Sequence, residues 1–408
     1  MFRSYLTSTI RHLLRNRAYT IINVLGLAIG MACTILIYLY VDFEYSWDHF
    51  RPNADRVYRV LQKGPTPFGG QHKPFEGLSG AVGPALVETF PEVEETCRFR
   101  IGHRWAKYKD FALRSGFWFT DTNALTFFGF QLARGDAESA LRVPNGVVLN
   151  PDIVSTFFGD EDPMGKTIEG QDGDFVVTGI LEPLPKNSML QFNFLTASVP
   201  PNIRRYAAWD DFARGPRQRQ TVTFIRLRPE ASADALSSKL ATFSQTLLPE
   251  SDREQQHYLL QSFLRMRMHK DIDFPEGVDG LASGMGSGNL NYIRTLILIG
   301  LAILIVACIN FMNLATAQAT KRAKEVGVRK SVGAGRSQLS TRFFAESLLL
   351  ALISLPVTWT IVQLAQPAWN GFIGQTTELD ILGRPEVYLG IAGIVISIGL
   401  ISGSYPAV

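Results

Sequence analysis

The feature that most constrains this chain is a basic segment, residues 321–339, that stands between two long apolar runs. These runs, residues 292–319 and 343–364, are each long enough to cross the roughly 30 Å hydrocarbon core of a membrane. The segment can therefore only be a short connection on one side of a membrane. Its cations far outnumber its single acid, Glu325, which is typical of the cytoplasmic side. The cations are Lys321, Arg322, Lys324, Arg329, Lys330 and Arg336.

Composition supports a membrane protein that carries a large polar domain. The chain has 408 residues, of which 46% are hydrophobic, and these gather in four runs. The polar region between the first two runs, residues 43–291, exceeds the usual domain size of about 100–150 residues. The net charge of +3 is segregated by compartment and forms no patch for nucleic acid. With Cys33 and Cys308 inside spans, Cys97 has no partner for an extracytoplasmic disulfide.

The first span fixes the expected topology. Residues 1–20 are basic and amphipathic, as in a cytoplasmic interfacial helix. Residues 21–42 then form transmembrane helix 1, whose apolar core is longer than the 7–15 residues of a signal peptide. Arginines precede this span and acids follow it, so we expect a cytoplasmic N-terminus and an extracytoplasmic domain at 43–291. Gly26 and Gly30 form a small-xxx-small pair that could pack on another helix.

The remaining spans complete the predicted fold class: four transmembrane α-helices, with a large α+β extracytoplasmic domain inserted between helices 1 and 2. We place helix 2 at residues 292–320, helix 3 at 343–364, an outer loop at 365–386, and helix 4 at 387–408. Trp369 in the outer loop is expected to anchor at the interface.

Three polar residues inside the spans allow different interpretations. Asn310 and Asn313 could hydrogen-bond to neighbouring helices, or simply lie near the inner interface. Glu346 is acidic within a span, which marks a candidate functional group, but pairing with Arg342 or Lys330 near the helix end is favoured.

The polar region has the pattern of an α+β domain with antiparallel or mixed sheets in two subdomains. Alternation and β-branched content predict strands, and apolar periodicity predicts helices. The strands are expected at residues 55–62, 175–181 and 221–229, and the helices at 81–90, 151–159 and 231–248.

Residues 159–167, GDEDPMGKT, superficially match a phosphate-binding loop. That loop needs four residues between its glycines, whereas five separate Gly159 from Gly165, and the intervening acids would repel phosphate. A tight turn leading into a strand is the better interpretation, so no ATP site is predicted.

The sequence in and around the basic segment resembles that of a known family. The approach NFMNLATAQAT, the segment KRAKEVGVRKSVGAGRSQL and the exit FFAESLLLAL are similar to the connection between the second and third spans of FtsX-like, MacB-type ABC transporter permeases. The polar region resembles the MacB-like periplasmic core domain through WDHFRPNADRVYRV and FVVTGILEPLPKNSMLQFNFL. The likeness covers almost the whole chain. From charge alone, the basic segment need only set topology.

The resemblance implies a function for the basic segment. In this family the connection is a coupling helix that seats in a groove of the ATPase subunit, which here corresponds to residues 321–342. The implied ATPase-coupling residues are Glu325, Gly327, Arg329, Lys330, Gly333 and Ala334. The family often repeats its plan in a second half, so Val408 is expected to be a truncation point.

The resemblance further implies the permease subunit of an ABC transporter in the bacterial plasma (inner) membrane. This subunit would bind no cofactor, because a separate ABC ATPase subunit would use the ATP. Mechanotransmission would couple hydrolysis to export or extraction of a substrate. The other expected partners are membrane lipid, a second copy or second permease half as a dimer, and a periplasmic adaptor or outer-membrane protein; nucleic acid is not expected.

Two alternatives stay open. A non-transporting FtsX-like regulator of a cell-envelope enzyme would share all of these features. A membrane-anchored sensor is less favoured, because the sequence has no cytoplasmic output domain. We do not expect an enzyme: no catalytic constellation and no cluster with metal-ligand spacing stands out.

Overall fold

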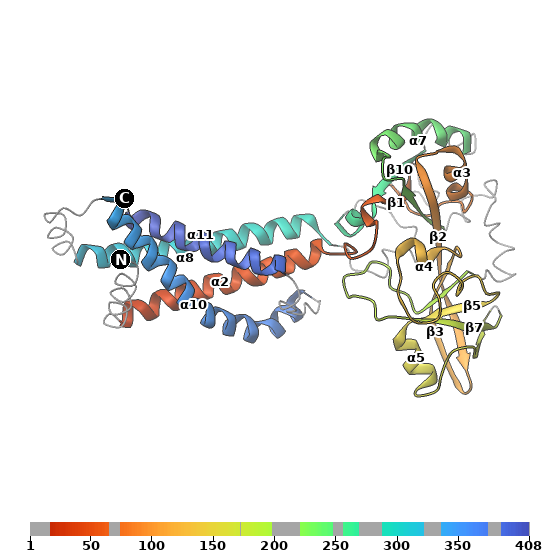
Figure 1. The fold of residues 1–408 in the computed structure, drawn as a ribbon, viewed down its shortest axis with the longest axis horizontal. Coiled ribbons are helices and arrows are strands. Elements are labelled where there is room, and N and C mark those ends of the chain that lie inside the picture. Colours follow the sequence, from red (N-terminus) through yellow and green to blue (C-terminus); the bar gives the residue numbers. More distant parts are fainter. Residues whose placement is uncertain are drawn as a thin grey trace. The chain divides into compact units, whose positions relative to one another are not determined.

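The computed structural model describes residues 17–64, 74–171, 173–197, 221–247, 256–268, 288–321, 336–373 and 385–407. The chain divides into two compact units. One is made of Met1–Tyr45 with Leu290–Val408, and the other of Ser46–Asn289. Figure 1 shows long helices in the first unit and the sheet in the second.

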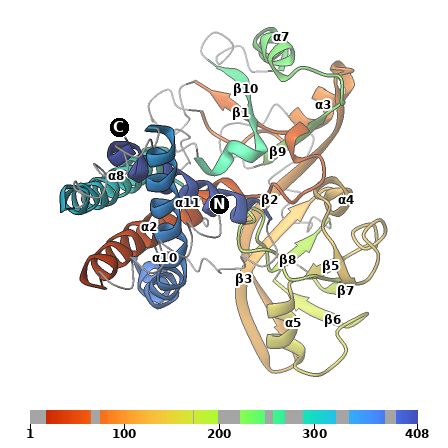
Figure 2. The same ribbon diagram turned by 60° about the vertical axis from the view of Figure 1, so that its left-hand side comes forward.

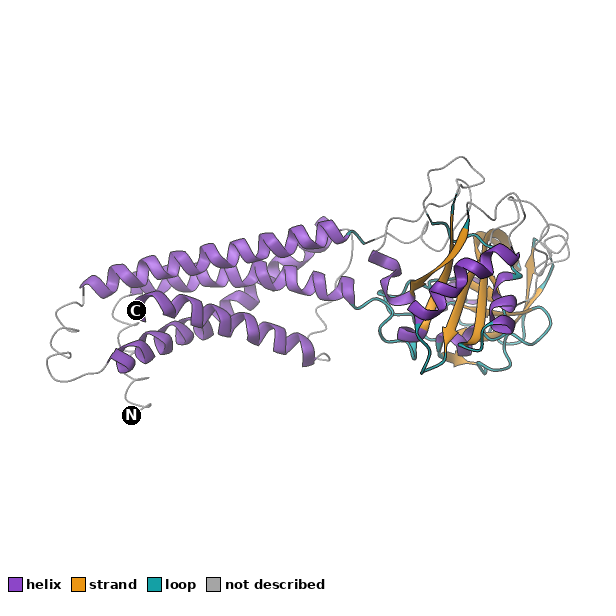
Figure 3. Cartoon of the chain, turned by 90° about the horizontal axis from the view of Figure 1, so that it is seen from above, coloured by secondary structure: helices purple, strands orange, loops and turns teal. Residues whose placement is uncertain are grey.

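The first unit is a helical bundle. Its helices α2 (Arg17–Tyr45), α8 (Leu290–Lys321), α10 (Arg336–Ile373) and α11 (Pro385–Ala407) run alongside one another (Figure 3). All four contribute to one buried apolar core, which includes Met31, Phe311, Leu350 and Ile398. The outward faces stay apolar too, as expected of helices surrounded by lipid.

Three helices in the described residues are long and apolar enough to cross a membrane: Arg17–Tyr45, Leu290–Ala317 and Phe344–Ile373. Within α11, the apolar stretch is the shorter Tyr388–Leu400. The predicted insertion of a large α+β domain between the first two apolar helices is therefore confirmed, whereas the predicted count of four spans is not.

Helix α10 differs from the predicted end of the third span. It continues to Ile373 rather than ending at residue 364, and it contains Pro356 and Pro367. From the sequence we placed an outer loop at residues 365–386, but α10 occupies the first part of that range although proline removes a helical hydrogen bond. In an apolar bundle the rest of the backbone still has to be satisfied within the helix, which explains why the helix passes through the proline.

Aromatic side chains gather where α2 ends, α8 begins and α10 ends. Tyr40 makes edge contacts with Tyr292, at a ring-centroid distance of 6.2 Å, and with Trp369, at 6.4 Å. Trp369 in turn lies 6.0 Å from Phe372. Such clusters are typical of the membrane interface.

The second unit is built on one ten-stranded sheet of mixed direction. The strand order is β10-β1-β9-β2-β3-β8-β5-β7-β4, and β6 pairs with β2 and β7. The β3/β8 and β5/β7 pairs are parallel, and the other pairs are antiparallel. The strands are β1 (Val57–Lys63), β2 (Val93–Tyr108), β3 (Phe111–Thr120), β4 (Leu132–Arg134), β5 (Gly146–Leu149), β6 (Thr167–Gly170), β7 (Phe175–Leu181), β8 (Phe194–Thr196), β9 (Val222–Leu227) and β10 (His257–Ser262).

Short helices cover this sheet, and their bounds agree closely with the three predicted from sequence. They are η1 (Ala54–Arg56), α3 (Val82–Thr89), α4 (Ala124–Phe128), α5 (Pro151–Phe158), α7 (Ala233–Leu247) and η3 (Phe263–Met268). Helix α5 shows why. The Asn150 side chain accepts a 2.9 Å hydrogen bond from the Asp152 amide as an N-cap, and Pro151 follows at the first helical position.

The sheet carries two separate apolar cores, in line with the predicted two subdomains. The first lies among β1, β9, α3 and α7 and contains Leu86, Ile225 and Leu240. The second lies among β3, β5, β7 and α5, where Phe157 and Phe194 are buried. Strand β2 contributes to both, so one continuous strand joins them (Figure 2). Each fully buried Val, Leu, Ile or Phe side chain in these cores contributes about 1.5–3 kcal/mol to stability.

Candidate functional site

The six predicted ATPase-coupling residues lie outside the described residues. Glu325, Gly327, Arg329, Lys330, Gly333 and Ala334 all fall within 322–335. The described helices that border this stretch are α8, which ends at Lys321, and α10, which begins at Arg336. Coupling through these residues therefore stays a prediction, and the described residues that can carry movement are the helices and the contacts at their ends.

Helices α2 and α8 pack closely at the two glycines that the sequence singled out. A Cβ on Gly30 would lie 2.7 Å from the Cβ of Ala307, which is closer than side chains tolerate. A Cβ on Gly26 would lie 3.2 Å from Nδ2 of Asn310. The predicted use of the Gly26/Gly30 pair for close helix packing is confirmed, because only the missing side chains let the two backbones approach.

The two asparagines of α8 are exposed on the outside of the bundle. Asn310 lies over Gly26, and Asn313 follows one turn later. Within the described helices we find no hydrogen bond for either side-chain amide. Around them, Val306 is 65% exposed and Ile309 is 44% exposed. The amides therefore interrupt an otherwise apolar outer face.

Glu346 faces the inside of the bundle, where it is buried beside the buried Ser347. Lys330, one of its predicted partners, lies outside the described residues. Further along α10, the Ser354 and Thr358 hydroxyls donate to the carbonyls of Leu350 and Ser354, so these buried polar groups are satisfied within the helix.

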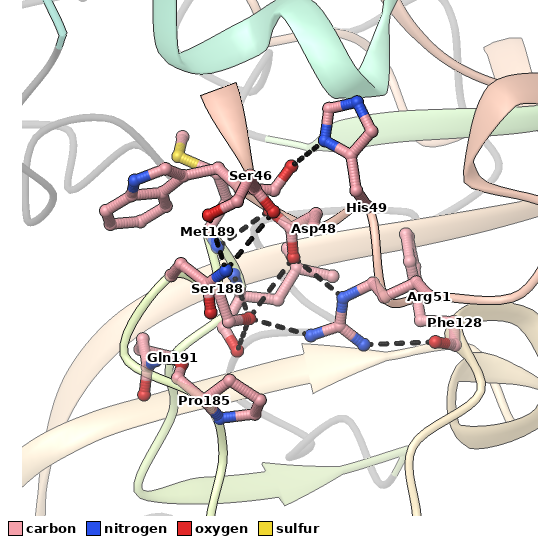
Figure 4. Close-up of polar contacts among 12 residues, drawn as sticks. Ser46, Asp48, His49, Arg51, Phe128, Pro185, Ser188, Met189 and Gln191 are labelled. Atoms are coloured by element: carbon pink, nitrogen blue, oxygen red, sulfur yellow. Dashed lines mark hydrogen bonds and ion pairs between the residues drawn. The ribbon is translucent and has the colours of Figure 1, made fainter. Parts of the chain in front are cut away.

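In the second unit, the first residues after α2 form a buried polar network, shown in Figure 4. Asp48 lies in the turn that follows the helix, and its Oδ1 accepts a 2.8 Å hydrogen bond from Nε of Arg51. The other carboxylate oxygen accepts from the amide of Met189 at 2.8 Å. Ser188 Oγ accepts from Arg51 Nη2 at 2.8 Å and lies 3.3 Å from Asp48 Oδ1. We call Asp48, Arg51, Ser188 and Met189 the polar anchor.

The polar anchor joins segments that are far apart in the sequence. Arg51 Nη1 donates to the Phe128 carbonyl at the end of α4 at 3.0 Å, and its guanidinium lies 4.4 Å from the centre of the Phe130 ring. The Asp48 amide donates to the Asn187 carbonyl at 3.0 Å. The chain that leaves α2 is thus fixed to both α4 and the loop after β7.

Burial shifts the pKa values of the two charged groups of the polar anchor, Asp48 and Arg51. It raises the pKa of Asp48, while the Arg51 guanidinium and the three hydrogen-bond donors oppose that rise. Burial also lowers the pKa of Arg51, and the Asp48 carboxylate opposes this. Removing either partner would leave a buried charge without compensation, which is far more costly than losing a surface ion pair.

A second contact ties η3 to the first residues of this unit. The Arg267 guanidinium, in η3, lies 3.6 Å from the centre of the Trp47 ring. Both residues are buried. Trp47 directly precedes Asp48, so η3 packs against the segment through which the chain enters the unit.

Sequence reasoning missed the polar anchor. From the sequence we noted only that acids follow the first span. The stretches WDHFRPNADRVYRV and KNSMLQFNF, which hold the two halves of the anchor, served only to identify the resemblance. A spacing of three residues between an acid and an arginine is too common to single out, and the partners at 188 and 189 are visible only in the fold.

No catalytic arrangement emerges from the part of the chain that the structure describes. It contains no group of three or more His, Cys, Asp or Glu that could hold a metal ion. Burial raises the pKa of the Cys97 thiol well above its usual value, which keeps it protonated and a poor nucleophile. Residues 159–167 form a turn that leads into β6, as the sequence indicated. Within this turn Glu161 pairs with Lys109 and Lys166.

Comparison with known families identifies both parts of the chain. Residues 20–243 match the model of the MacB-like periplasmic core domain, and residues 297–408 match the model of the FtsX-like permease C-terminal region.

Similar curated proteins share modest identity. A Neisseria gonorrhoeae macrolide export ATP-binding/permease protein MacB is 22% identical over 64% of this chain and 36% of its own length. The corresponding protein of Syntrophobacter fumaroxidans is 22% identical over 79% of this chain and 49% of its own. The Bacillus subtilis ABC transporter permease YknZ is 34% identical over 30% of each. The chain thus spans at most about half the length of these relatives.

Two solved structures are also similar. A domain of a permease protein from Porphyromonas gingivalis covers 56% of this chain and 97% of its own, with 24% identity and a TM-score of 0.45. The periplasmic region of MacB from Actinobacillus actinomycetemcomitans covers 52% and 90%, with 12% identity and a TM-score of 0.37.

Proposed function

The chain belongs to the family of MacB-like, FtsX-like ABC transporter permeases, and from this premise we propose that it is the membrane subunit through which a separate ATPase moves an extracytoplasmic domain. The main support for the proposal is that two family models match this one chain. The MacB-like periplasmic core domain matches residues 20–243, and the FtsX-like permease C-terminal region matches residues 297–408. The chain is a multi-pass membrane protein with an extracytoplasmic domain. We propose that its N-terminus lies in the cytoplasm of a bacterium.

In this proposal, ATP binds to the partner, and closure of that partner pushes residues 321–342. Helix α8 immediately precedes this segment in the chain and packs on α2 at Gly30 and Ala307. A displacement of one helix would therefore shift the other. The polar anchor, which follows α2 in the chain, would be the first part of the domain to receive the movement. The work would drive export or extraction of a substrate.

We also propose that a second copy or a second permease half packs beside α8. An amide that faces hydrocarbon without a partner is unfavourable, whereas an amide that meets another helix can hydrogen-bond across it. Asn310 and Asn313 offer two such groups on the outer face, one turn apart. A periplasmic adaptor or an outer-membrane protein would complete an export assembly.

The test is affinity purification of the full-length protein in mild detergent, followed by mass spectrometry and an ATPase assay. We expect an ABC ATPase subunit to co-purify. Gly333→Leu or Glu325→Lys should uncouple hydrolysis from function while membrane insertion is retained, because each matches a residue of the coupling pattern. Ser331→Ala, in the same segment but not among the implied coupling residues, is the matched control.

The outcome decides between the candidate functions. Normal coupling in both Gly333→Leu and Glu325→Lys would overturn the proposed role of the segment. Recovery of the chain without any ATPase would favour a membrane-anchored sensor. Co-purification of a cell-wall hydrolase with the ATPase would favour the non-transporting regulator.

A further inference from the structure

The end of the β2–β3 hairpin has one buried face and one open face. On the buried face, Ala106 and Phe117 pack into the second core with no exposure. On the opposite face, the register pairs His103 with Gly116, Trp105 with Arg114, and Lys107 with Ala112. Because paired residues share a face of the sheet, these six residues form one surface, which we call the Trp105 face. Figure 2 shows the long hairpin that carries it.

Trp105 is the centre of this face and is 53% exposed. Its diagonal neighbours on β3, Gly116 and Ala112, are the smallest residues available. A Cβ on Gly116 would meet nothing within 4 Å, so the space beside the indole is open. In the described residues no cation is found over the Trp105 ring, in contrast to the ring of Trp47, on which Arg267 is stacked. The indole face can therefore be reached by a ligand.

The backbone under Trp105 is held on both sides. On one side β3 pairs with it along the whole hairpin. On the other side β6 pairs with Ala106 and Lys107, and the Gln171 amide donates to the Trp105 carbonyl at 3.0 Å. A binding platform built on a rigid sheet loses little conformational entropy when a ligand arrives.

The three larger side chains beside the indole can form hydrogen bonds, and two of them are positively charged. His103, Lys107 and Arg114 are exposed on the face itself. Glu169 lies beside Lys107 with an Nζ to Oε2 distance of 3.3 Å, and both are at least half exposed, so water screens the pair and lysine stays available to a ligand. Arg114 presents a planar guanidinium that suits a carboxylate.

We propose that the Trp105 face binds an acidic saccharide, a sugar chain that carries carboxylates. A pyranose ring has an apolar C–H face that stacks on an indole, and hydroxyls at its rim that need donors and acceptors close by. The Trp105 face offers this combination: one exposed aromatic plane inside a ring of polar side chains, with Arg114 for the carboxylate. An extracytoplasmic domain would meet such chains in the cell envelope.

A protein partner fits this face less well. Stable protein interfaces have a desolvated centre of several apolar side chains surrounded by a polar rim. Trp105 is the one large apolar side chain exposed here among the described residues, since Phe111 lies on the other face of the hairpin. The saccharide site goes beyond the proposed transport function and does not depend on an ATPase, so the two can fail separately.

The test is isothermal titration of the full chain in detergent with a galacturonic acid hexamer. The matched ligand is the methyl ester of the same hexamer, which has the same rings without the charge. We expect the acid to bind more tightly than its ester, and the difference to shrink in salt. Trp105→Ala should weaken binding at least about tenfold, as is usual when a central aromatic is truncated. Arg114→Gln should remove the preference for the acid.

The control variant is Phe111→Ala, which removes an exposed aromatic from the other face of the same hairpin and should leave binding unchanged. Because Trp105 is largely exposed, Trp105→Ala should keep the wild-type unfolding temperature. Absence of binding by the wild type, or equal binding by Trp105→Ala, would overturn the proposal. Equally tight binding of a hexaglutamate peptide would overturn it in favour of a protein partner.

Discussion

Nε of Arg51 donates a 2.8 Å hydrogen bond to the Asp48 carboxylate, and the two side chains are only 3% and 1% exposed. This buried ion pair stands a few residues after the end of the first membrane helix. Surface ion pairs contribute little to stability, whereas removing one partner of a buried pair is strongly destabilising, because a buried charge is left without compensation. The pair therefore holds the start of the extracytoplasmic domain against α4 and the loop after β7.

Asp48→Ala should destabilise the domain by about 3–5 kcal/mol, because Arg51 would remain buried without its counter-charge. Thermal unfolding of the purified full chain, followed by tryptophan fluorescence, measures the effect. Glu138→Ala, which removes an exposed acid, is the control and should change little. Equal unfolding temperatures for the two variants would show that the pair does not anchor the domain.

Gly30→Ala should loosen the bundle, because the new Cβ would meet that of Ala307 at 2.7 Å. Overpacking of this kind costs about 1–3 kcal/mol. Gly393→Ala is the matched control, since a Cβ there meets nothing within 4 Å. Titration of both variants with a denaturing detergent, followed by circular dichroism, should give an earlier transition for Gly30→Ala alone. Coincident transitions would contradict the close packing of α2 on α8.

Asn310→Leu combined with Asn313→Leu should weaken the proposed lateral association of permease units. Interhelical hydrogen bonds in membranes average about 0.6 kcal/mol, so the dissociation constant should rise several-fold for the pair. Energy transfer between labelled chains diluted into lipid vesicles measures it. Ile309→Leu, on the same exposed part of α8, is the control. Unchanged association in the double variant would place the interface elsewhere.

The lysine contacts of Glu161 should make the stability of the domain depend on pH. Hydrogen bonds from Lys109 and Lys166 lower its pKa from 4.5 to about 2. Since the folded state holds the carboxylate charged, the stabilisation is fully present above pH 4.5 and is lost as the pH falls through about 2. Because the group is exposed, the effect should be small and weaker in salt.

Glu161→Gln should therefore unfold slightly earlier than the wild type at pH 7, and the difference should shrink as the pH is lowered from 4.5 towards 2. Unfolding temperatures over this range provide the measurement. A difference that grows in acid would show that the lysine pairs do not hold this carboxylate in its charged form.

Much of the fold could be predicted because local pattern alone specifies it. Strand β7 occupies the predicted residues 175–181, and α5 begins at the predicted Pro151. The close packing at Gly26 and Gly30 was also predicted, because four-residue spacing places both on one side of a helix. The 16-residue strand β2 was not predicted: its burial pattern alternates only in part, because its two ends serve different cores.

The sequence by itself determined the apolar spans, the inserted domain and the family. These depend on hydrophobic runs and on contiguous sequence motifs, which can be recognised without the fold. The polar anchor and the Trp105 face were decided only by the tertiary structure. Arg51 meets Ser188 because the loop after β7 closes onto the turn after α2. Trp105 and Arg114 belong to one hairpin, whose register places them on the same face. The first pairing depends on the whole fold, whereas the exposure of the Trp105 face depends on which side of the hairpin the rest of the domain buries.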